Sequence, residues 1–436
     1  MTGPNGELRN CREGTRHPDA EGRPRHGETA GAAAGARDPE DGPQTPDEGL
    51  RTPDEGLRRP GTGAVVAGMV TWPAPAEPFP EARGVRSILI VKTSALGDVI
   101  HALPTLYALR SLFPEARISW AVEPRFADLV PGPPWTDSLV LFRKAEMRAM
   151  TLRGKIVALG EMRREMLPMK FDLALDLQGL MKSTLIALLS GARRRLGYCE
   201  MREGSRLFTR AVKGPNRSGH VIQRYLDVAR SLGPVPDEVR FPLPDCSQET
   251  GEMRRKLLAA GIRGPLALLF PGAGWESKLW PARLYAGLAD SLAGLGMAVA
   301  LGGGPGDGPL AREIAGLAAA GPGSVRDLTG ATDIRGLMGL TSLSSVCVGS
   351  DTGPLHLAAA QGTPTVSLFG PSSGERAGTW GDAARYVATD APCSPCFKRR
   401  CPRKKFICME RVDPAEVLGR VRELVDLYPP KRLDEV

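Results

Sequence analysis

The chain has 436 residues, of which 42% are hydrophobic and 5% aromatic, and it carries a formal net charge of +8 at pH 7. This length is sufficient for two domains of ordinary size plus an extension. No uninterrupted apolar stretch approaches the roughly 18 to 20 residues of a membrane-spanning helix, and the short apolar run at residues 63–70 lacks the flanks of a signal peptide. We therefore expect a soluble, cytoplasmic protein whose positive charge suits an anionic partner.

The first 85 residues differ in composition from the rest of the chain. They are rich in Gly, Pro, Arg, Glu and Asp, and they contain the repeat TPDEGLR at Thr45 and again at Thr52. Such a segment buries too little apolar surface to offset the entropy cost of ordering it. We predict a disordered low-complexity extension over residues 1–85. One interpretation is a dispensable segment, or upstream sequence ahead of a true start near Met69. The other is a regulatory or partner-binding tail.

The ordered sequence begins with SILIVKT at residues 87–93, a continuous β-branched run typical of a buried parallel strand. The turn SALG and a helical pattern up to Phe113 follow, and a second strand is expected over residues 117–123. Strand, helix and strand in this order form the βαβ unit of a parallel sheet. We assign residues 86–240 to an N-terminal Rossmann-like domain. Its other expected elements are strands over 137–142 and 171–177 and a helix over 220–233.

The same alternation restarts after a proline-rich connector at residues 234–245. Strands are expected in PLALLFPGAG, MAVALGGGPGD, LSSVCVGSDTG and TPTVSLFG, with helices between them. The last helix has Asp413 as its N-cap and Pro414 at its first position. We assign residues 246–436 to a second Rossmann-like domain, so the predicted fold is α/β with two such domains.

Ligands of an open parallel sheet bind beyond the carboxyl ends of its strands. In the second domain the turns at that edge are PGAGWESK, GGGPGD and SDTGPLH. Glycine lets backbone N–H groups approach a ligand, and a helix N-terminus attracts phosphate. Lys278, in the first of these turns, adds a full positive charge. The turns therefore indicate a site for a nucleoside diphosphate in a cleft between two facing domains.

Asp98, in SALGDVIH, occupies the equivalent turn of the first domain. Its carboxylate either caps the following helix or acts as a general base toward a ligand of the second domain. A nucleoside diphosphate leaving group needs stabilising charge but little protonation, so one carboxylate suffices to take the proton of the acceptor hydroxyl. The chain contains no Asp-x-Asp, the pattern of a metal-clamped sugar-nucleotide site. Helix N-termini and Lys278 would replace that metal.

The turn SDTGPLH also has two interpretations on its residues alone. Asp351 and Thr352 suit the cap of a helix that begins near Pro354, and His356 suits an imidazole bonded to backbone within that helix. Alternatively, the same side chains bind the ligand.

Four of the eight cysteines lie together in CSPCFKRRCPRKKFIC, namely Cys393, Cys396, Cys401 and Cys408. Four thiols in so short a segment resemble a compact metal site, although the later spacings match no standard zinc pattern. The sequence leaves two states of these cysteines open: ligands of a structural metal, or disulfides or reduced thiols. The other cysteines are singly placed, which suits a reducing compartment.

Five motifs occur in the order that they have in the lipopolysaccharide heptosyltransferases of glycosyltransferase family 9, which the chain resembles over about residues 86–428. They are ILIVKTSALGDVIHALPTL, DLQGLMKS, FPGAGWESKLWP, GGPGD and SDTGPLHLAAAQGTPTVSLFGPS. KTSALGD and DLQGLMKS look more like heptosyltransferase I than heptosyltransferase II. The resemblance implies a GT-B fold, with an acceptor domain and an ADP-sugar donor domain facing across a cleft. It also implies inverting transfer of heptose from ADP-heptose to the Kdo/lipid A inner core, with no cofactor required.

The resemblance also implies roles for individual residues. Asp98 matches the family's catalytic base, and Lys278 matches the lysine at the phosphate-sugar region of the donor. The matching donor-binding residues are Asp307, Asp351, Thr352, Gly353 and His356. Apart from the resemblance, the charges of Lys182 and Arg224 suit a phosphorylated or carboxylated glycolipid, so these two residues are the expected acceptor contacts. Basic residues such as Arg193, Arg194 and Arg195 suit peripheral association with the anionic cytoplasmic face of the inner membrane.

Three alternatives compete with this interpretation. The first is a related GT-B transferase that uses another nucleotide sugar or a later core acceptor, as heptosyltransferase II does. The second is a nucleotide-binding oxidoreductase or epimerase, which the first turn disfavours because it is KTSALGD and not G-x-G-x-x-G. The third is a nucleic-acid-binding protein, which the low aromatic content disfavours.

Overall fold

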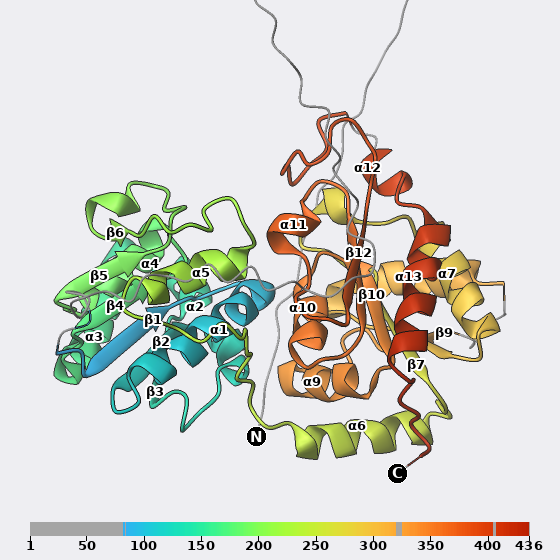
Figure 1. The fold of residues 1–436 in the computed structure, drawn as a ribbon, viewed down its shortest axis with the longest axis horizontal. Helices are drawn as coiled ribbons and strands as arrows, with labels where there is room; N and C mark the ends of the chain where they lie inside the picture. Colours follow the sequence, from blue (N-terminus) through green and yellow to red (C-terminus); the bar gives the residue numbers. More distant parts are fainter. Residues whose placement is uncertain (1–81, 83, 320–324, 404–406, 436) are drawn as a thin grey trace, which may run out of the picture. The chain divides into compact units, whose positions relative to one another are not determined.

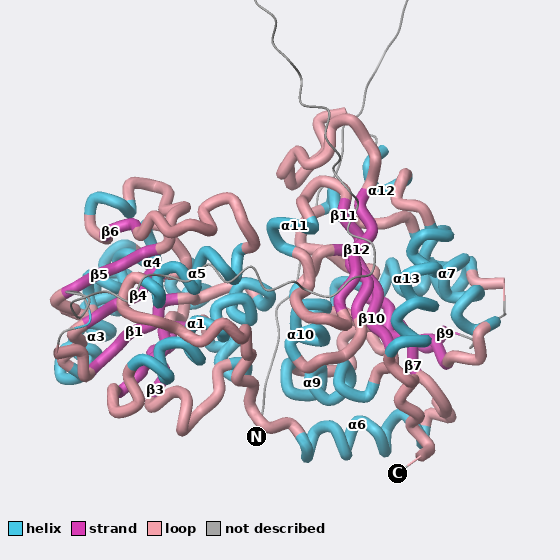
Figure 2. Tube along the Cα trace, in the orientation of Figure 1, coloured by secondary structure: helices cyan, strands magenta, loops and turns pink. Residues whose placement is uncertain are grey.

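The computed structural model describes residues 82, 84–319, 325–403 and 407–435. It contains two parallel six-stranded sheets, with helices packed on both faces of each (Figures 1 and 2). We call the part built on the first sheet the N-terminal lobe and the part built on the second sheet the C-terminal lobe. All described residues belong to one compact unit.

The sheet of the N-terminal lobe has the strand order β3-β2-β1-β4-β5-β6. Its strands are β1 (Ser87–Val91), β2 (Arg117–Val122), β3 (Ser138–Leu141), β4 (Leu173–Asp176), β5 (Arg194–Gly197) and β6 (Arg210–Ala211). In register, Ile88 lies between Ile118 and Leu173. All five residues of β1 are buried, as a strand covered on both faces requires.

Two pairs of helices cover this sheet. Helices α1 (Leu96–Leu112) and α5 (Val221–Arg230) pack on one face. Helices α3 (Leu152–Met166) and α4 (Met181–Leu189) pack on the other, where Met162 and Ile186 enter its apolar core. The short helix α2 (Lys144–Ala149) follows β3.

The sheet of the C-terminal lobe has the order β12-β11-β10-β7-β8-β9. Its strands are β7 (Leu266–Phe270), β8 (Ala298–Leu301), β9 (Val325–Asp327), β10 (Val346–Ser350), β11 (Thr365–Phe369) and β12 (Ala384–Ala388). One face packs against α7 (Ala282–Gly294), α8 (Gly308–Leu317) and α13 (Pro414–Leu427). The other packs against α6 (Ser247–Ala259), α9 (Ile334–Leu343) and α10 (Gly353–Ala360). The helices α11 (Gly374–Ala377) and α12 (Ile407–Glu410) are one turn each.

Close packing joins α1, the first helix of the N-terminal lobe, to the start of α10 in the C-terminal lobe. Met338 of α9 and Leu357 of α10 belong to the same apolar cluster as Val99 of α1. A Cβ added to Gly353 would lie only 2.6 Å from Cβ of Leu96, so the N-termini of α1 and α10 approach as closely as glycine permits.

The predicted strands and helices are confirmed in both lobes, and the two-domain α/β class is correct. Asp413 caps α13 as expected, because its side chain accepts a hydrogen bond from the Ala415 amide at 2.9 Å. The patterns did not predict β5, β6, β9 or β12, which are short or carry charged residues. The predicted disordered extension lies almost wholly outside the described residues, and the boundaries at 240 and 246 stay predictions.

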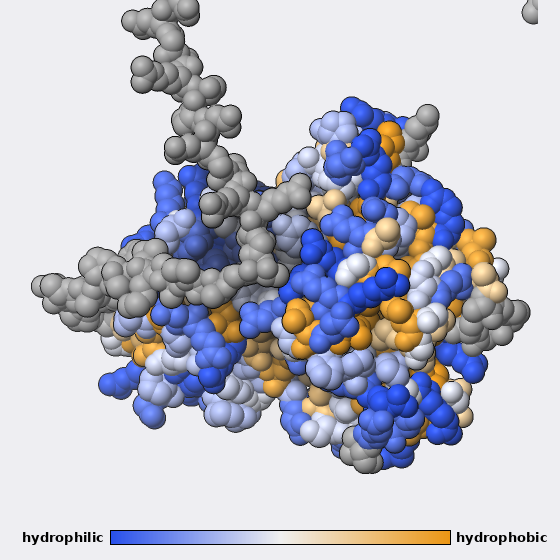
Figure 3. Space-filling view, turned by 45° about the vertical axis from the view of Figure 1, so that its right-hand side comes forward, coloured by the Kyte–Doolittle hydropathy of each residue, from blue (hydrophilic) through white to orange (hydrophobic). Residues whose placement is uncertain are grey.

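None of the described helices has the length and apolarity needed to cross a membrane. On the face seen in Figure 3, hydrophilic side chains break up the apolar ones into separate patches.

Removing the Asp176 carboxylate tests how the turn after β4 is held. This buried group accepts hydrogen bonds from the amides of Gln178 (3.1 Å) and Gly179 (2.9 Å) and from the Thr184 hydroxyl (2.8 Å). Asp176→Ala leaves these donors without their acceptor, so we expect chemical denaturation to show a loss of about 2–4 kcal/mol of unfolding free energy. The exposed Asp426→Ala is the control and should change it by less than about 0.5 kcal/mol. An equal loss of unfolding free energy in the two variants would contradict the role of Asp176 in holding this turn.

Candidate active site

The turn after β10 is organised around the carboxylate of Asp351. Its Oδ2 lies 2.6 Å from Nζ of Lys278 and accepts a hydrogen bond from the Ser372 hydroxyl at 3.0 Å, and its Oδ1 lies 3.2 Å from Nε2 of His356. Burial by itself raises the pKa of Asp351. The hydrogen bond from His356 and the charge of Lys278 outweigh burial and hold this pKa well below its usual range. The turn therefore contains a carboxylate that stays ionised and is fully engaged with its neighbours.

Lys278 reaches this turn from the segment after β7. It ends the 3₁₀ turn Glu276–Lys278, and its Nζ lies 4.5 Å from the ring centroid of Trp275. The Ser350 hydroxyl donates to the Lys278 carbonyl at 2.6 Å. Because β7 and β10 are neighbours in the sheet, two segments far apart in the sequence meet at one edge.

Thr352 presents an unused hydroxyl at the start of α10. It is the N-cap residue of that helix, but its side chain makes no capping hydrogen bond. Its buried Oγ1 has no hydrogen-bond partner among the residues that the structure describes. The capping interpretation thus does not account for this side chain. An unpaired hydroxyl beside a helix N-terminus is chemically suited to a phosphate oxygen.

Asp307 lies against the turn that leads to Lys278. Its Oδ2 accepts from the Gly304 amide at 2.8 Å. A Cβ added to Gly272 would lie 2.2 Å from the Asp307 Oδ1, so the glycine is required for the close approach of these two turns. The structure thus brings together the three Gly-rich turns that the sequence singled out.

Asp98 lies in the first turn of α1, directly after a glycine that packs against this cluster. A Cβ added to the preceding Gly97 would be 2.7 Å from Cδ2 of His356. The Asp98 Oδ2 accepts from the Ala95 amide at 3.2 Å, so the residue does stabilise the start of the helix. Its side chain nevertheless remains 44% exposed, which leaves the carboxylate accessible to a substrate.

Lys92 is a site residue that the sequence reasoning missed. Its side chain is 2% exposed, and its Nζ lies 3.8 Å from Oδ1 of Asp98. The same ammonium donates to the Tyr225 hydroxyl at 2.7 Å and to the Leu177 carbonyl at 3.0 Å. A lysine at the end of the apolar run SILIVKT was the available signal, because a buried ammonium needs partners.

His101 was also missed, although it lies one helical turn beyond Asp98. Its Nε2 is 3.1 Å from Nδ1 of His356, so a continuous chain of polar contacts runs from Lys278 through Asp351 and His356 to α1. His220, the N-cap of α5, lies with its ring centroid 5.8 Å from that of His101. Three of the five histidines of the chain therefore cluster here.

Burial controls the charge of two of these histidines. Burial, reinforced by His356, lowers the pKa of His101 well below its usual value. Burial also lowers the pKa of His220 to about 4, although the hydrogen bond with the Gly378 carbonyl by itself raises this pKa. Both imidazoles are therefore neutral at pH 7.

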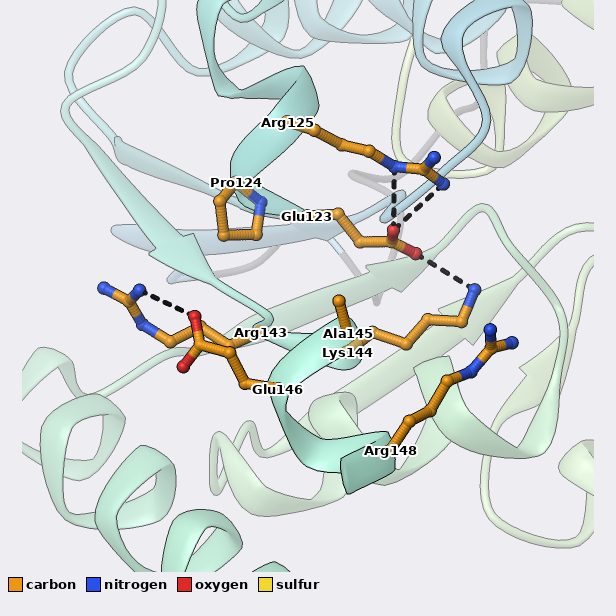
Figure 4. A pocket seen from close by; sticks show the side chains of 8 residues that line it. All are labelled: Glu123, Pro124, Arg125, Arg143, Lys144, Ala145, Glu146 and Arg148. Atoms are coloured by element: carbon orange, nitrogen blue, oxygen red, sulfur yellow. Dashed lines mark hydrogen bonds and ion pairs between the residues drawn. The ribbon is translucent and has the colours of Figure 1, made fainter. Parts of the chain in front are cut away.

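A basic pocket of about 300 Å³ opens at the carboxyl ends of β2 and β3 (Figure 4). Its floor is the buried carboxylate of Glu123, whose oxygens lie 3.2 Å from Arg125 and 3.3 Å from Lys144. Arg143 and Arg148 also line it. Positive charge exceeds negative charge around this pocket, so it suits an anion.

The two predicted acceptor residues have different environments. Burial and the charge of Lys144 lower the pKa of Lys182, which places Lys182 beside the basic pocket. Arg224 is buried, and its guanidinium already donates to Glu200 at 2.6 Å and to the Gly219 carbonyl at 2.8 Å. In this conformation Arg224 is committed to structural contacts.

The cysteine cluster does not support the structural metal that its spacing suggested. All four cysteines line one small pocket. Within the described residues, however, no three His, Cys, Asp or Glu side chains are arranged so that they could hold a metal ion. That interpretation of Cys393, Cys396, Cys401 and Cys408 is therefore not supported.

Two parallel α/β lobes, with phosphate-suited turns in one and an accessible carboxylate at the matching edge of the other, have the architecture of a GT-B type glycosyltransferase. Residues 159–407 match the model of glycosyltransferase family 9 (heptosyltransferase). The chain is 31% identical over 366 residues to lipopolysaccharide heptosyltransferase 1 of Pseudomonas aeruginosa. The aligned region covers 78% of this chain and 98% of that relative. The chain belongs to glycosyltransferase family 9 and is a glycosyltransferase of the heptosyltransferase type.

Solved structures confirm the fold. A family 9 glycosyltransferase from Veillonella parvula superposes with a TM-score of 0.68 at 21% identity, covering 81% of this chain and 99% of that one. The Escherichia coli heptosyltransferase WaaC with ADP-2-deoxy-2-fluoro heptose gives a TM-score of 0.59 at 21% identity, covering 77% and 99%.

The neutral histidines predict a loss of stability in mild acid. An unfolded histidine takes up a proton near pH 6.5, whereas folded His220 does so near pH 4, so the unfolded state binds more protons between these values. The stabilisation is complete above about pH 6.5 and is lost as the pH falls toward 4. We expect His220 to account for about 1–2 kcal/mol of unfolding free energy lost between pH 7 and pH 5.

Denaturation curves at several pH values check this expectation. The double variant His101→Asn/His220→Gln should show a flatter dependence over the same range. A wild-type protein with equal stability at pH 7 and pH 5 would contradict it.

Proposed function

We propose that the enzyme transfers heptose from ADP-heptose to the Kdo/lipid A inner core of lipopolysaccharide, at the cytoplasmic face of the inner membrane. The single observation that carries the proposal is the donor turn, where Lys278, the unpaired Thr352 hydroxyl and the α10 N-terminus converge. The Pseudomonas aeruginosa relative, a lipopolysaccharide heptosyltransferase 1, supports the identity of donor and acceptor.

Lys278 and the α10 N-terminus would stabilise the diphosphate of the donor. Asp351 orients Lys278, and the Thr352 hydroxyl and the backbone at Gly353 supply hydrogen bonds. His356 holds Asp351, and Asp307 keeps the neighbouring turn in place. The leaving ADP would thus be stabilised by fixed charge and hydrogen bonds, so the transfer would need no metal.

Asp98 would act as the general base of an inverting displacement. The acceptor hydroxyl oxygen bonds to the anomeric carbon from the face opposite the leaving group, while the bond from that carbon to the phosphate oxygen breaks. Asp98 takes the hydroxyl proton, and ADP leaves with the electron pair of the broken bond. The ammonium of Lys92, 3.8 Å from Oδ1 of Asp98, would help to hold this carboxylate in position.

The basic pocket would hold the anionic groups of the acceptor. Lys144, Arg148 and Lys182 lie at the same edge of the sheet as Asp98, and a Kdo sugar carries a carboxylate that they suit. Arg224 would act indirectly, through its contact with Glu200.

A heptosyltransferase II-like acceptor is less favoured. The lipooligosaccharide heptosyltransferase 2 of Campylobacter jejuni is 22% identical to this chain over 338 residues, against 31% for the type 1 relative.

The direct test is release of ADP from ADP-heptose with Kdo-lipid A, without added divalent metal and with lipid A lacking Kdo as the control. Release only with an acceptor that already carries heptose would overturn the proposed acceptor.

Replacing Asp98 separates chemistry from donor binding. Asp98→Asn keeps an oxygen for the Ala95 amide but cannot take a proton, so we expect turnover to fall by about 10²–10⁴-fold. Calorimetric ADP affinity should stay within about twofold, since Asp98 does not touch the donor turn. The exposed Asp128→Asn is the matched control. Retention of more than a tenth of the activity by Asp98→Asn would refute its role as the base.

Replacing Arg148 tests the basic pocket. It is exposed and belongs to the pocket wall, so Arg148→Ala should raise the KM for Kdo-lipid A by about 5–20-fold, as expected for a lost charged contact. The KM for ADP-heptose should not change. Arg422→Ala, on α13 of the other lobe, is the control. A change in donor KM with no change in acceptor KM would place the acceptor elsewhere.

A further inference from the structure

Helix α3 has an exposed apolar face that the proposed reaction does not explain. Leu152, Ile156 and Val157 are 76%, 62% and 53% exposed, which is unusual for three aliphatic side chains on one helix of a soluble protein. The helix is firmly attached through its opposite side, where Met162 and Met166 are buried in the core beneath the sheet. Thr151 caps its start by accepting a hydrogen bond from the Gly154 amide at 3.2 Å. The exposed aliphatic residues therefore belong to a fixed helix.

Arginines alternate with these aliphatic side chains. At about 100° per residue, Arg153, Arg163 and Arg164 fall within the same arc of about 140° as the three apolar residues. Arg163 and Arg164 are exposed, as is Arg153. The acidic residues of α3, Glu161 and Glu165, lie about 40° and about 80° beyond the edge of this arc. We call these six arginine and aliphatic side chains the α3 face.

Aliphatic and arginine side chains on one face are typical of helices that lie in a lipid–water interface. Aliphatic groups enter the hydrocarbon boundary, while arginines stay at the level of the anionic head groups. The attraction of each cation to the anionic surface contributes about 1 kcal/mol to binding. The chain as a whole has a net charge of +8, which further favours an anionic surface.

The position of α3 relative to the basic pocket favours lipid over a protein partner. Arg148, which lines the pocket, precedes Leu152 by only four residues, and α2 contacts α3. A glycolipid whose acyl chains lie in a bilayer against α3 would therefore present its anionic head group beside the pocket. This argument rests on the proposed function, because it takes the acceptor to be lipid-linked.

We propose that the α3 face docks the enzyme on an anionic lipid bilayer and places the acceptor pocket at the level of the head groups. The sequence suggested Arg193, Arg194 and Arg195 for this role, and of these Arg195 is less suitable than the α3 face. Arg195 is only partly exposed and donates to the carbonyls of Ala192 (2.9 Å) and Phe208 (3.0 Å).

Vesicle flotation of the full chain tests the proposal without donor or acceptor. The vesicles contain phosphatidylethanolamine and phosphatidylglycerol at a ratio of about 3:1, and phosphatidylcholine vesicles serve for comparison. The triple variant Leu152→Ser/Ile156→Ser/Val157→Ser should reduce the fraction bound by at least about tenfold. Arg153→Gln/Arg164→Gln should reduce binding by about tenfold and weaken its salt dependence.

Matched controls lie on the other lobe. Leu427→Ser removes an aliphatic side chain that is 59% exposed, and Arg422→Gln removes an exposed arginine. Neither substitution should change the fraction of protein bound to vesicles. Binding of the triple variant within twofold of wild type would overturn the proposal. Concentration-dependent dimerisation that the triple variant abolishes, with no vesicle binding by wild type, would assign the α3 face to a second copy instead.

Activity on a deacylated, water-soluble acceptor separates this proposal from the proposed function. The triple variant should retain wild-type turnover with that acceptor. Normal vesicle binding without ADP release would refute the function alone, whereas normal ADP release with unimpaired vesicle binding by the triple variant would refute the docking surface alone.

Discussion

The ion pair between Lys278 and Asp351 is the interaction on which the donor turn depends. Both side chains are largely buried, and removing two charges from water is costly unless further hydrogen bonds compensate. His356 and the Ser372 hydroxyl supply them, so every Asp351 oxygen has a partner. These contacts fix the turn, and they would leave the Thr352 hydroxyl and the helix N-terminus for the proposed donor. Such preorganisation is the main means by which an enzyme stabilises a charged leaving group.

The same network reaches the other lobe through the contact of His356 with His101 on α1. Asp98 lies one turn earlier on this helix, so the residue proposed as the base shares its scaffold with a neighbour of the donor turn. Two glycines, Gly97 and Gly353, permit the close approach. In the proposed mechanism, diphosphate stabilisation would belong to one sheet edge and proton removal to the other, and buried imidazoles connect the two edges.

The sequence predicted the central strands correctly and singled out the turn after β10, because both patterns are local. A run such as SILIVKT, followed by a turn and a helical pattern, is typical of a buried parallel strand, and several Gly-rich turns at one sheet edge together indicate a phosphate site. Lys92 and His101 were not predicted, because their importance comes from contacts with Tyr225 and His356, which lie far away in the sequence. Arg224 shows the converse: its type suited an acceptor contact, but burial and Glu200 occupy it. The α3 face was also missed, since exposure of an amphipathic helix depends on which side packs on the sheet.

The most direct measurement is a crystal structure of the enzyme with the unreactive donor ADP-2-deoxy-2-fluoro heptose. The account predicts the diphosphate within hydrogen-bonding distance of Lys278 Nζ and Thr352 Oγ1, with the anomeric carbon directed toward Asp98. A diphosphate bound away from both Lys278 and Thr352, or an anomeric carbon directed away from Asp98, would contradict it.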